Sequence, residues 1–319
     1  MSVSTVTTTA SEQAKRFKRL ERRVQLRYLL LLLPALIFLF LFYGYPVAAM
    51  LARSFNDPVW GLDNFRKLTK VRRHEDFLFL SIPSNGYIHV FLITLRIAGV
   101  VTFLTLVLGY PVAYVLASIR NSRANLLLIL VLIPFWTSIL VRSYAWMVLL
   151  GREGSINRLL INVGIRDEPM QLLNTRFAVY VGMVHILLPF MILPLYSVMR
   201  GIDRSYLRAA SNLGASDARV FRHIFLPLSL PGVAAGCWVV FILSLGFYIT
   251  PALIGGPKDI MISMLIAQQV NTLNWGFAAA LALVLLAIAL LIFLIFNRVL
   301  GVDKPYGGTR KCEVSPSRG

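Results

Sequence analysis

The chain has 319 residues and a formal net charge of +18, and 57% of its residues are hydrophobic while only 14% are charged. Because a soluble domain carries about 25% charged residues, this composition excludes an ordinary soluble protein. The basic residues fall between apolar segments, a pattern that indicates orientation in a lipid membrane and argues against nucleic acid as a partner.

Six apolar segments are each long enough to cross about 30 Å of hydrocarbon as a helix. They lie at residues 28–51, 90–118, 125–149, 176–198, 228–250 and 276–299. The pattern predicts an all-α integral membrane protein with a six-span domain over residues 28–300. A basic tail over 1–27 and a second tail over 301–319 flank this domain.

Lysine and arginine are divided unevenly between the two sides of the membrane. With six spans, the side that holds both termini carries 19 of these residues and the opposite side carries 11. Membrane proteins keep the basic excess in the cytoplasm. We therefore predict cytoplasmic termini, with the loop 200–224 in the cytoplasm. On the outer side, the apolar spacing of Ser155–Gly164 predicts a short interfacial helix.

The third apolar segment contains a charged residue, Arg142, within PFWTSILVRSYAW. An arginine at this depth is costly and marks a functional site, for which Thr137, Ser138 and Tyr144 are the polar neighbours. The alternative is a side chain that extends to the outer interface. We keep both interpretations. The spans contain no Asp or Glu, which argues against a carrier coupled to protons or sodium.

The fifth segment ends in LSLGFYITPALIGGP, over residues 243–257. Two prolines and a double glycine predict a helix break inside or just beyond the membrane, where polar backbone must be buried or line water. Ser244, Tyr248 and Thr250 then face a translocation pathway. The alternative is a loop that only leaves the bilayer.

Residues 206–231 (YLRAASNLGASDARVFRHIFLPLSLP) form a polar, basic segment between two apolar ones. Asp203 or Ser205 can cap a first helix, and Gly214 can end that helix in a left-handed turn. Ser216 can cap a second helix, which we expect Pro227 to stop. We therefore predict a pair of short helices at the membrane surface, with Ala215 among the small residues that let a partner approach.

The spacing R-A-A-x₃-G-x₉-I-x-L-P in this segment is similar to the E-A-A-x₃-G-x₉-I-x-L-P signature of permease subunits of binding-protein-dependent ABC importers. The signature positions are Arg208, Ala209, Ala210, Gly214, Ile224, Leu226 and Pro227. Arg208 departs from the pattern, since the family usually has Glu there. Residues 58–68 also resemble the G-L-x-N-F segment that follows the first span in such permeases.

The resemblance implies a bacterial inner-membrane location and three kinds of protein partner. These are an ABC ATPase subunit that receives the short helices in a groove, a second permease subunit and a periplasmic solute-binding protein. The chain has no P-loop pattern and no clustered catalytic or metal-ligating residues. We therefore expect no enzyme activity and no cofactor, with ATP hydrolysis in the separate subunit.

The motif L-G-x-[FY]-[IV]-x-P-x-L-x-G-G at 245–256, together with residues 134–146 and 185–199, resembles the polyamine-type branch of these permeases. That resemblance implies spermidine or putrescine as the substrate. An opine-like, amino-acid-like or other carboxylated solute is the alternative, because Arg142 would suit a carboxylate. A secondary carrier that works without an ATPase is the less favoured alternative.

Overall fold

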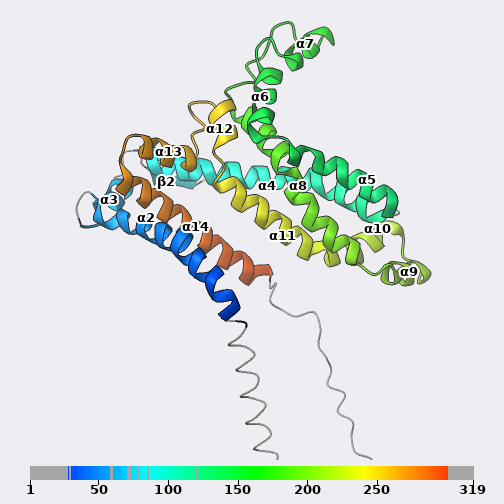
Figure 1. Cartoon of the computed structure of the whole chain (residues 1–319). Coiled ribbons are helices and arrows are strands. Elements are labelled where there is room, and N and C mark those ends of the chain that lie inside the picture. Colours follow the sequence, from blue (N-terminus) through cyan, green and yellow to red (C-terminus); the bar gives the residue numbers. More distant parts are fainter. Residues whose placement is uncertain are drawn as a thin grey trace, which may run out of the picture.

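The computed structural model of the protein describes residues 28–300, except 29, 58–59, 70–72, 78–79, 85 and 120. The tails predicted over 1–27 and 301–319 lie outside the described residues. Within those residues the structure consists almost entirely of helices joined by short loops (Figure 1).

Five apolar helices have the length and composition of membrane spans. They cover Leu30–Asn56, Gly86–Ser118, Arg176–Gly201, Asp217–Leu245 and Trp275–Arg298. A sixth candidate is a pair of helical segments, Ser122–Trp136 and Ile139–Asn162, that meet at 89°. The predicted all-α membrane fold is confirmed, and the structure holds six candidate spans when this bent pair is taken as one span. A single straight helix over 125–149 is wrong.

The bend in the third span has a local cause. Helix α5 (Asn121–Leu132) passes into a 3₁₀ turn, η2 (Ile133–Trp136), that contains Pro134. Proline removes a backbone donor and clashes with the preceding turn, so an α-helix does not continue through it here. The chain restarts as α6 (Ile139–Leu150), where the hydroxyl of Ser138 accepts a hydrogen bond from the backbone N–H of Leu140.

The core of the molecule is a body of three helices. These are α4 (Gly86–Ser118), α8 (Arg176–Gly201) and α11 (Leu226–Leu245), which run beside one another in Figure 1. Glycines allow close approach of their backbones. A Cβ on Gly109 would lie 3.1 Å from Cγ of Met191, and one on Gly236 would lie 2.8 Å from its sulfur. Close packing of this kind holds helices together in lipid.

A second group of helices lies beside the core. It contains α2 (Tyr45–Asn56), α3 (Asp63–Thr69), α13 (Ile262–Asn271) and α14 (Trp275–Leu300). Buried Asn64 donates from its amide to the carbonyl oxygens of Ser54 (3.1 Å) and Asp57 (2.8 Å). Since the last carbonyls of a helix lack partners within it, Asn64 closes the end of α2. This contact gives the G-L-x-N-F segment a structural role.

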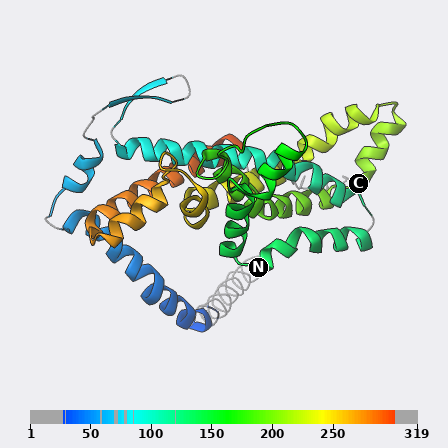
Figure 2. The ribbon, with the colours of Figure 1, turned by 90° about the horizontal axis from the view of Figure 1, so that it is seen from above.

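An antiparallel ribbon of two strands was not predicted. β1 (Arg73–Phe77) pairs with β2 (Leu80–Ser84), with Arg73 opposite Ser84 and Phe77 opposite Leu80. Figure 2 shows the ribbon outside the helical body, near the start of α4. The sequence RHEDF lacks the alternation of apolar and polar residues that predicts a strand.

The expectation that Pro227 stops a helix is wrong. Helix α10 (Asp217–Val220) continues through a π-helical turn, η3 (Phe221–Phe225), directly into α11, and Pro227 lies in the first turn of α11. A proline ring would clash with the carbonyl four residues earlier in a regular helix. The wider turn immediately before Pro227 therefore lets the helix continue, and an equivalent π-helical turn precedes Pro46.

Candidate functional site

The segment that we name the coupling loop covers residues 203–227. Its first helix, α9 (Arg204–Asn212), begins after Asp203, whose carboxylate accepts a hydrogen bond from the backbone N–H of Ser205 at 2.8 Å. Asp203 is thus the cap, as one of the two alternatives predicted. Hydrogen bonds from the backbone and the hydroxyl of Ser205 lower the pKa of Asp203, and the charge of Arg208 acts in the same direction.

The turn after α9 has the predicted left-handed geometry. Gly214 has φ +83°, and its N–H bonds to the carbonyl of Ser211 while that of Ala215 bonds to Ala210. This pair of bonds is a Schellman motif, which favours glycine at its centre. A Cβ on Gly214 would meet no atom of the described residues within 4 Å. A side chain at this position therefore causes no clash within the described part of the chain.

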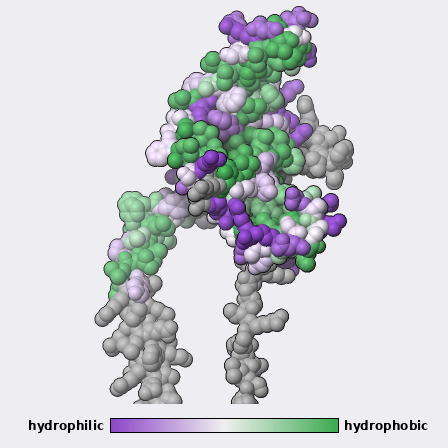
Figure 3. Space-filling view, turned by 90° about the vertical axis from the view of Figure 1, so that its right-hand side faces the viewer, coloured by the Kyte–Doolittle hydropathy of each residue, from purple (hydrophilic) through white to green (hydrophobic). Residues whose placement is uncertain are grey.

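Two exposed apolar side chains on the coupling loop were not singled out from the sequence. Tyr206 is 60% exposed and Leu213 is 89% exposed. They lie seven residues apart, two helical turns, so they share one side of α9. That spacing is the signal that was missed. Figure 3 shows hydrophilic side chains gathered where α9 and α10 lie, below the hydrophobic surface of the spans.

The structure places all the coupling residues predicted from the signature in this one loop and the start of α11. Arg208, Ala209 and Gly214 are exposed, and Ala210 and Ala215 are half-buried. Ile224 and Leu226 are half-buried and Pro227 is exposed. The exposed signature positions thus consist of Arg208, the two small residues Ala209 and Gly214, and Pro227.

The predicted pathway residues separate into buried and accessible groups. Thr250, in α12 (Ile249–Ile254), is fully buried and its hydroxyl lies 2.9 Å from that of Ser143 in α6. This contact joins the third span to the break in the fifth. Ser244 is also fully buried, and its hydroxyl has no hydrogen-bond partner among the described residues.

The remaining predicted pathway residues reach the surface. Thr137 is exposed and its hydroxyl donates to the carbonyl of Pro134, and Ser138 is the exposed cap of α6. Tyr144 is 53% exposed and Tyr248 is 45% exposed. Both tyrosine side chains are therefore accessible to a molecule that lies against the spans.

Arg142 lies one turn before Trp146 on α6. Its Nε atom is buried without a hydrogen-bond partner among the described residues. The indole N–H of Trp146 donates to Nδ1 of His185 in α8 at 3.1 Å. This hydrogen bond is a direct contact between α6 and α8.

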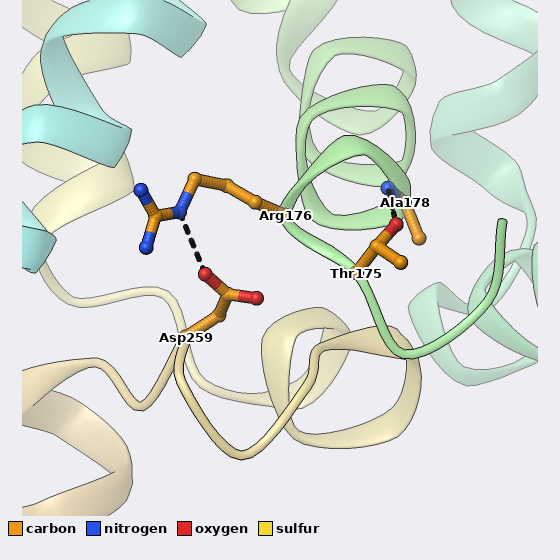
Figure 4. A network of polar contacts seen from close by, with 4 residues as sticks. All are labelled: Thr175, Arg176, Ala178 and Asp259. Atoms are coloured by element: carbon orange, nitrogen blue, oxygen red, sulfur yellow. Dashed lines mark hydrogen bonds and ion pairs between the residues drawn. The ribbon is translucent and has the colours of Figure 1, made fainter. Parts of the chain in front are cut away.

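The double glycine of the fifth segment ends α12 and permits close packing. A Cβ on Gly256 would lie 2.4 Å from the carbonyl oxygen of Asn174. Beyond it, the carboxylate of Asp259 accepts a hydrogen bond from Nε of Arg176, at the start of α8, at 2.7 Å (Figure 4). The predicted helix break is thus present, and a tight contact with the N-terminal end of α8 explains its glycines.

Comparison with known proteins assigns the chain to a family. Residues 105–301 match the family described as binding-protein-dependent transport system inner membrane component. The chain belongs to this family. It is 39% identical over 246 residues to the spermidine/putrescine transport system permease protein PotB of Escherichia coli K12, covering 77% of this chain and 84% of that protein. It is 38% identical over 206 residues to PotB of Haemophilus influenzae, covering 64% and 72%.

Solved structures of the same fold agree with this assignment. One is a bacterial ABC transporter involved in the import of the acidic polysaccharide alginate, with a TM-score of 0.69 and 20% identity over 89% of this chain and 98% of that chain. A second is the alginate transporter in complex with an alginate pentasaccharide-bound periplasmic protein, also at a TM-score of 0.69 and 20% identity, covering 89% and 96%. The interpretation of the sequence as an inner-membrane permease is confirmed.

Proposed function

We propose that the chain is the permease subunit of an ATP-driven importer that moves a polyamine, such as spermidine or putrescine, across the bacterial inner membrane. The observation that carries this proposal is the 39% identity to a spermidine/putrescine permease over 77% of the chain. The coupling loop supports it, because its cap, its left-handed glycine and its exposed apolar residues form a surface suited to a groove.

The proposed assembly contains an ABC ATPase subunit, a second permease subunit and a periplasmic solute-binding protein. ATP is hydrolysed in the ATPase subunit, against which the coupling loop docks on the cytoplasmic side. Both termini lie on that same side. Arg208 replaces the glutamate of the family signature, so the groove offers it an acidic or hydrogen-bonding group rather than a basic one.

The translocation pathway passes the accessible face of α6 and the start of α12. Tyr144 and Tyr248 are the aromatic side chains suited to ammonium groups, since a cation is attracted to the face of an aromatic ring. Apart from Asp217 at the first residue of its span and Glu153 in the turn that follows α6, the described spans carry no carboxylate. The second permease therefore supplies the acidic groups that a polyamine needs.

A second candidate substrate class is a carboxylated solute. It is favoured by one observation, the buried Nε of Arg142 that has no partner among the described residues. An arginine with unused donors suits a carboxylate by paired hydrogen bonds. The two candidates share the importer assembly and differ only in the solute.

The test is reconstitution of the complete importer in proteoliposomes with its binding protein and ATP. Labelled spermidine and putrescine are offered, with an excess of an unlabelled opine-like or amino-acid solute in parallel samples. ATP-dependent polyamine uptake that survives the carboxylated competitor supports the proposal. Uptake of only the carboxylated solute favours the second candidate, and uptake that needs no ATPase contradicts both.

A further inference from the structure

Both ends of the coupling loop are attached to the same helix, α4. Before the loop begins, Nη1 of Arg200 donates to the carbonyl oxygens of Ala117 and Ile119, both at 3.2 Å. Inside the loop, Nη2 of Arg204 donates to the oxygens of Ala117 (3.0 Å) and Ser118 (3.1 Å). Two arginines thus hold the carbonyl groups at the C-terminal end of α4.

The hydrogen bonds between these two arginines and the carbonyl groups of α4 are strengthened by charge. The last carbonyls of a helix have no donor within it and carry partial negative charge. A guanidinium group supplies several fixed donors and a permanent positive charge, so its hydrogen bonds to such carbonyls are stronger than neutral ones. Displacement of α9 therefore pulls on the end of α4.

The exit of the loop is attached to α4 by aromatic rings. Tyr114 makes edge contacts with Phe221 (ring centroids 5.5 Å apart) and Phe225 (5.0 Å). The hydroxyl of Tyr110 lies 3.0 Å from that of fully buried Ser229 in α11. The two attachments border a cavity of about 1220 Å³ between the loop and the end of α4.

The opposite end of α4 contacts the outer segment that follows the helix break. Buried Thr94 accepts a hydrogen bond through Oγ1 from the backbone N–H of Ile262, the first residue of α13, at 2.9 Å. Thr94 and Ala117 are 23 positions apart in one helix, a distance of roughly 35 Å at 1.5 Å per residue. Figure 2 shows α9 and α10 near one end of α4 and α13 near the other.

Resting on the proposed function, we propose that α4 transmits movement of the coupling loop to α13 on the outer side, with Arg200 and Arg204 as the positioning residues. Arg200 holds the C-terminal end of α4 to the end of α8, and Arg204 holds it to α9. The aromatic rings hold the same end to η3, and Thr94 holds the other end to α13. A shift of the docked coupling loop then moves α4, and α4 in turn moves α13.

The experiment separates coupling from docking in the reconstituted importer. Arg200→Gln and Arg204→Gln are combined in one protein, and Thr94→Val is made in another. Arg298→Gln, which removes a charge from an exposed position at the end of the last span, is the control for the arginines, and Thr94→Ser is the control that keeps the hydroxyl. Each protein is scored for co-purified ATPase, ATP hydrolysis and labelled spermidine uptake.

We expect the double glutamine variant and Thr94→Val to keep ATPase co-purification and ATP hydrolysis while uptake per ATP falls about tenfold, within the usual range of coupling between two sites. The two controls should keep the wild-type ratio, and Arg200→Lys with Arg204→Lys should recover part of it because the charge remains. A wild-type ratio in the double variant, or equal loss of uptake and hydrolysis, overturns the proposal. Failure of the unaltered importer to hydrolyse ATP or to import would instead contradict the proposed function.

Discussion

Arg176 at the first residue of α8 pairs with Asp259 in the loop between α12 and α13, with 2.7 Å between Nε and Oδ1. The arginine side chain is 32% exposed, whereas the aspartate side chain is 6% exposed. The arginine of this ion pair therefore remains in contact with solvent, whereas the aspartate is buried. It fixes the segment after the helix break to the start of a core helix.

This asymmetry predicts unequal effects of removing the two partners. Arg176→Gln leaves a buried carboxylate without its cation, and loss of one partner of a buried pair costs about 3 kcal/mol or more. Asp259→Asn leaves an arginine that can reach water, so its cost is smaller. Thermal unfolding of the purified permease in detergent measures both. Lys258→Gln, exposed and adjacent, should change stability by less than about 0.5 kcal/mol. A larger loss for Asp259→Asn than for Arg176→Gln would contradict this reading.

Gly214→Asp is expected to abolish ATP-driven uptake and to weaken ATPase association while the permease stays in the membrane. The chain itself has open space at this position, so the substitution costs only the left-handed strain of about 1–2 kcal/mol within the permease. A matched control exists in Gly164→Asp, because Gly164 also has a positive φ (+74°) and no atom of the described residues lies within 4 Å of a Cβ at that position. Gly164 lies beyond α7 (Ser155–Asn162), outside the coupling loop, and the control should transport normally. Full transport by Gly214→Asp would show that the coupling loop does not link ATP hydrolysis to movement.

Leu213→Ser is expected to reduce co-purification of the ATPase subunit without lowering the thermal stability of the permease. The side chain is 89% exposed in the chain, so its removal loses no internal packing. Burial of a leucine in a partner groove is worth about 1.5–3 kcal/mol. Pull-down of the ATPase across a range of permease concentrations measures the loss. An unchanged pull-down would mean that Leu213 stays outside the docked surface.

The spans, the first short helix of the coupling loop and the left-handed glycine were predictable because each has a local cause in the sequence. Apolar length predicts a span, and Asp203 and Gly214 mark the start and end of α9. The bend at Pro134 and the continuous helix through Pro227 were misjudged, since proline can end a helix or be absorbed by a π-helical turn. Contacts between residues far apart in the sequence, such as Trp146 with His185, leave no local pattern in the sequence. They are seen only in the three-dimensional structure.

Topology is tested by labelling single cysteines in a chain with Cys237→Ser and Cys312→Ser. Ser2→Cys and Ser317→Cys should react with an impermeant reagent only from the cytoplasmic side, since the basic excess lies there. Lys258→Cys should react only from outside. Inside-out and right-side-out vesicles give the two measurements. Termini that label from opposite sides would require an odd number of spans and would contradict the six-span arrangement.

Arg142 and Tyr248, two residues of the predicted pathway, give a prediction that separates transport from packing. Arg142→Ala and Tyr248→Ala should change the KM or kcat of uptake while ATPase co-purification stays at the wild-type level. Tyr248 is 45% exposed, and the Nε of Arg142 has no partner among the described residues, so neither removal breaks a hydrogen bond recorded there.

The matched comparison is the variant Thr250→Val. In the unaltered chain, the Thr250 hydroxyl lies 2.9 Å from that of buried Ser143. Because this change leaves a buried hydroxyl with one partner fewer, it should lower thermal stability by about 1 kcal/mol and affect uptake only through the amount of folded protein. Uptake kinetics normalised to folded permease distinguish the two kinds of residue. If Arg142→Ala and Tyr248→Ala both import with wild-type kinetics, Arg142 extends to the interface and Tyr248 faces lipid, and the pathway lies along another face of the spans.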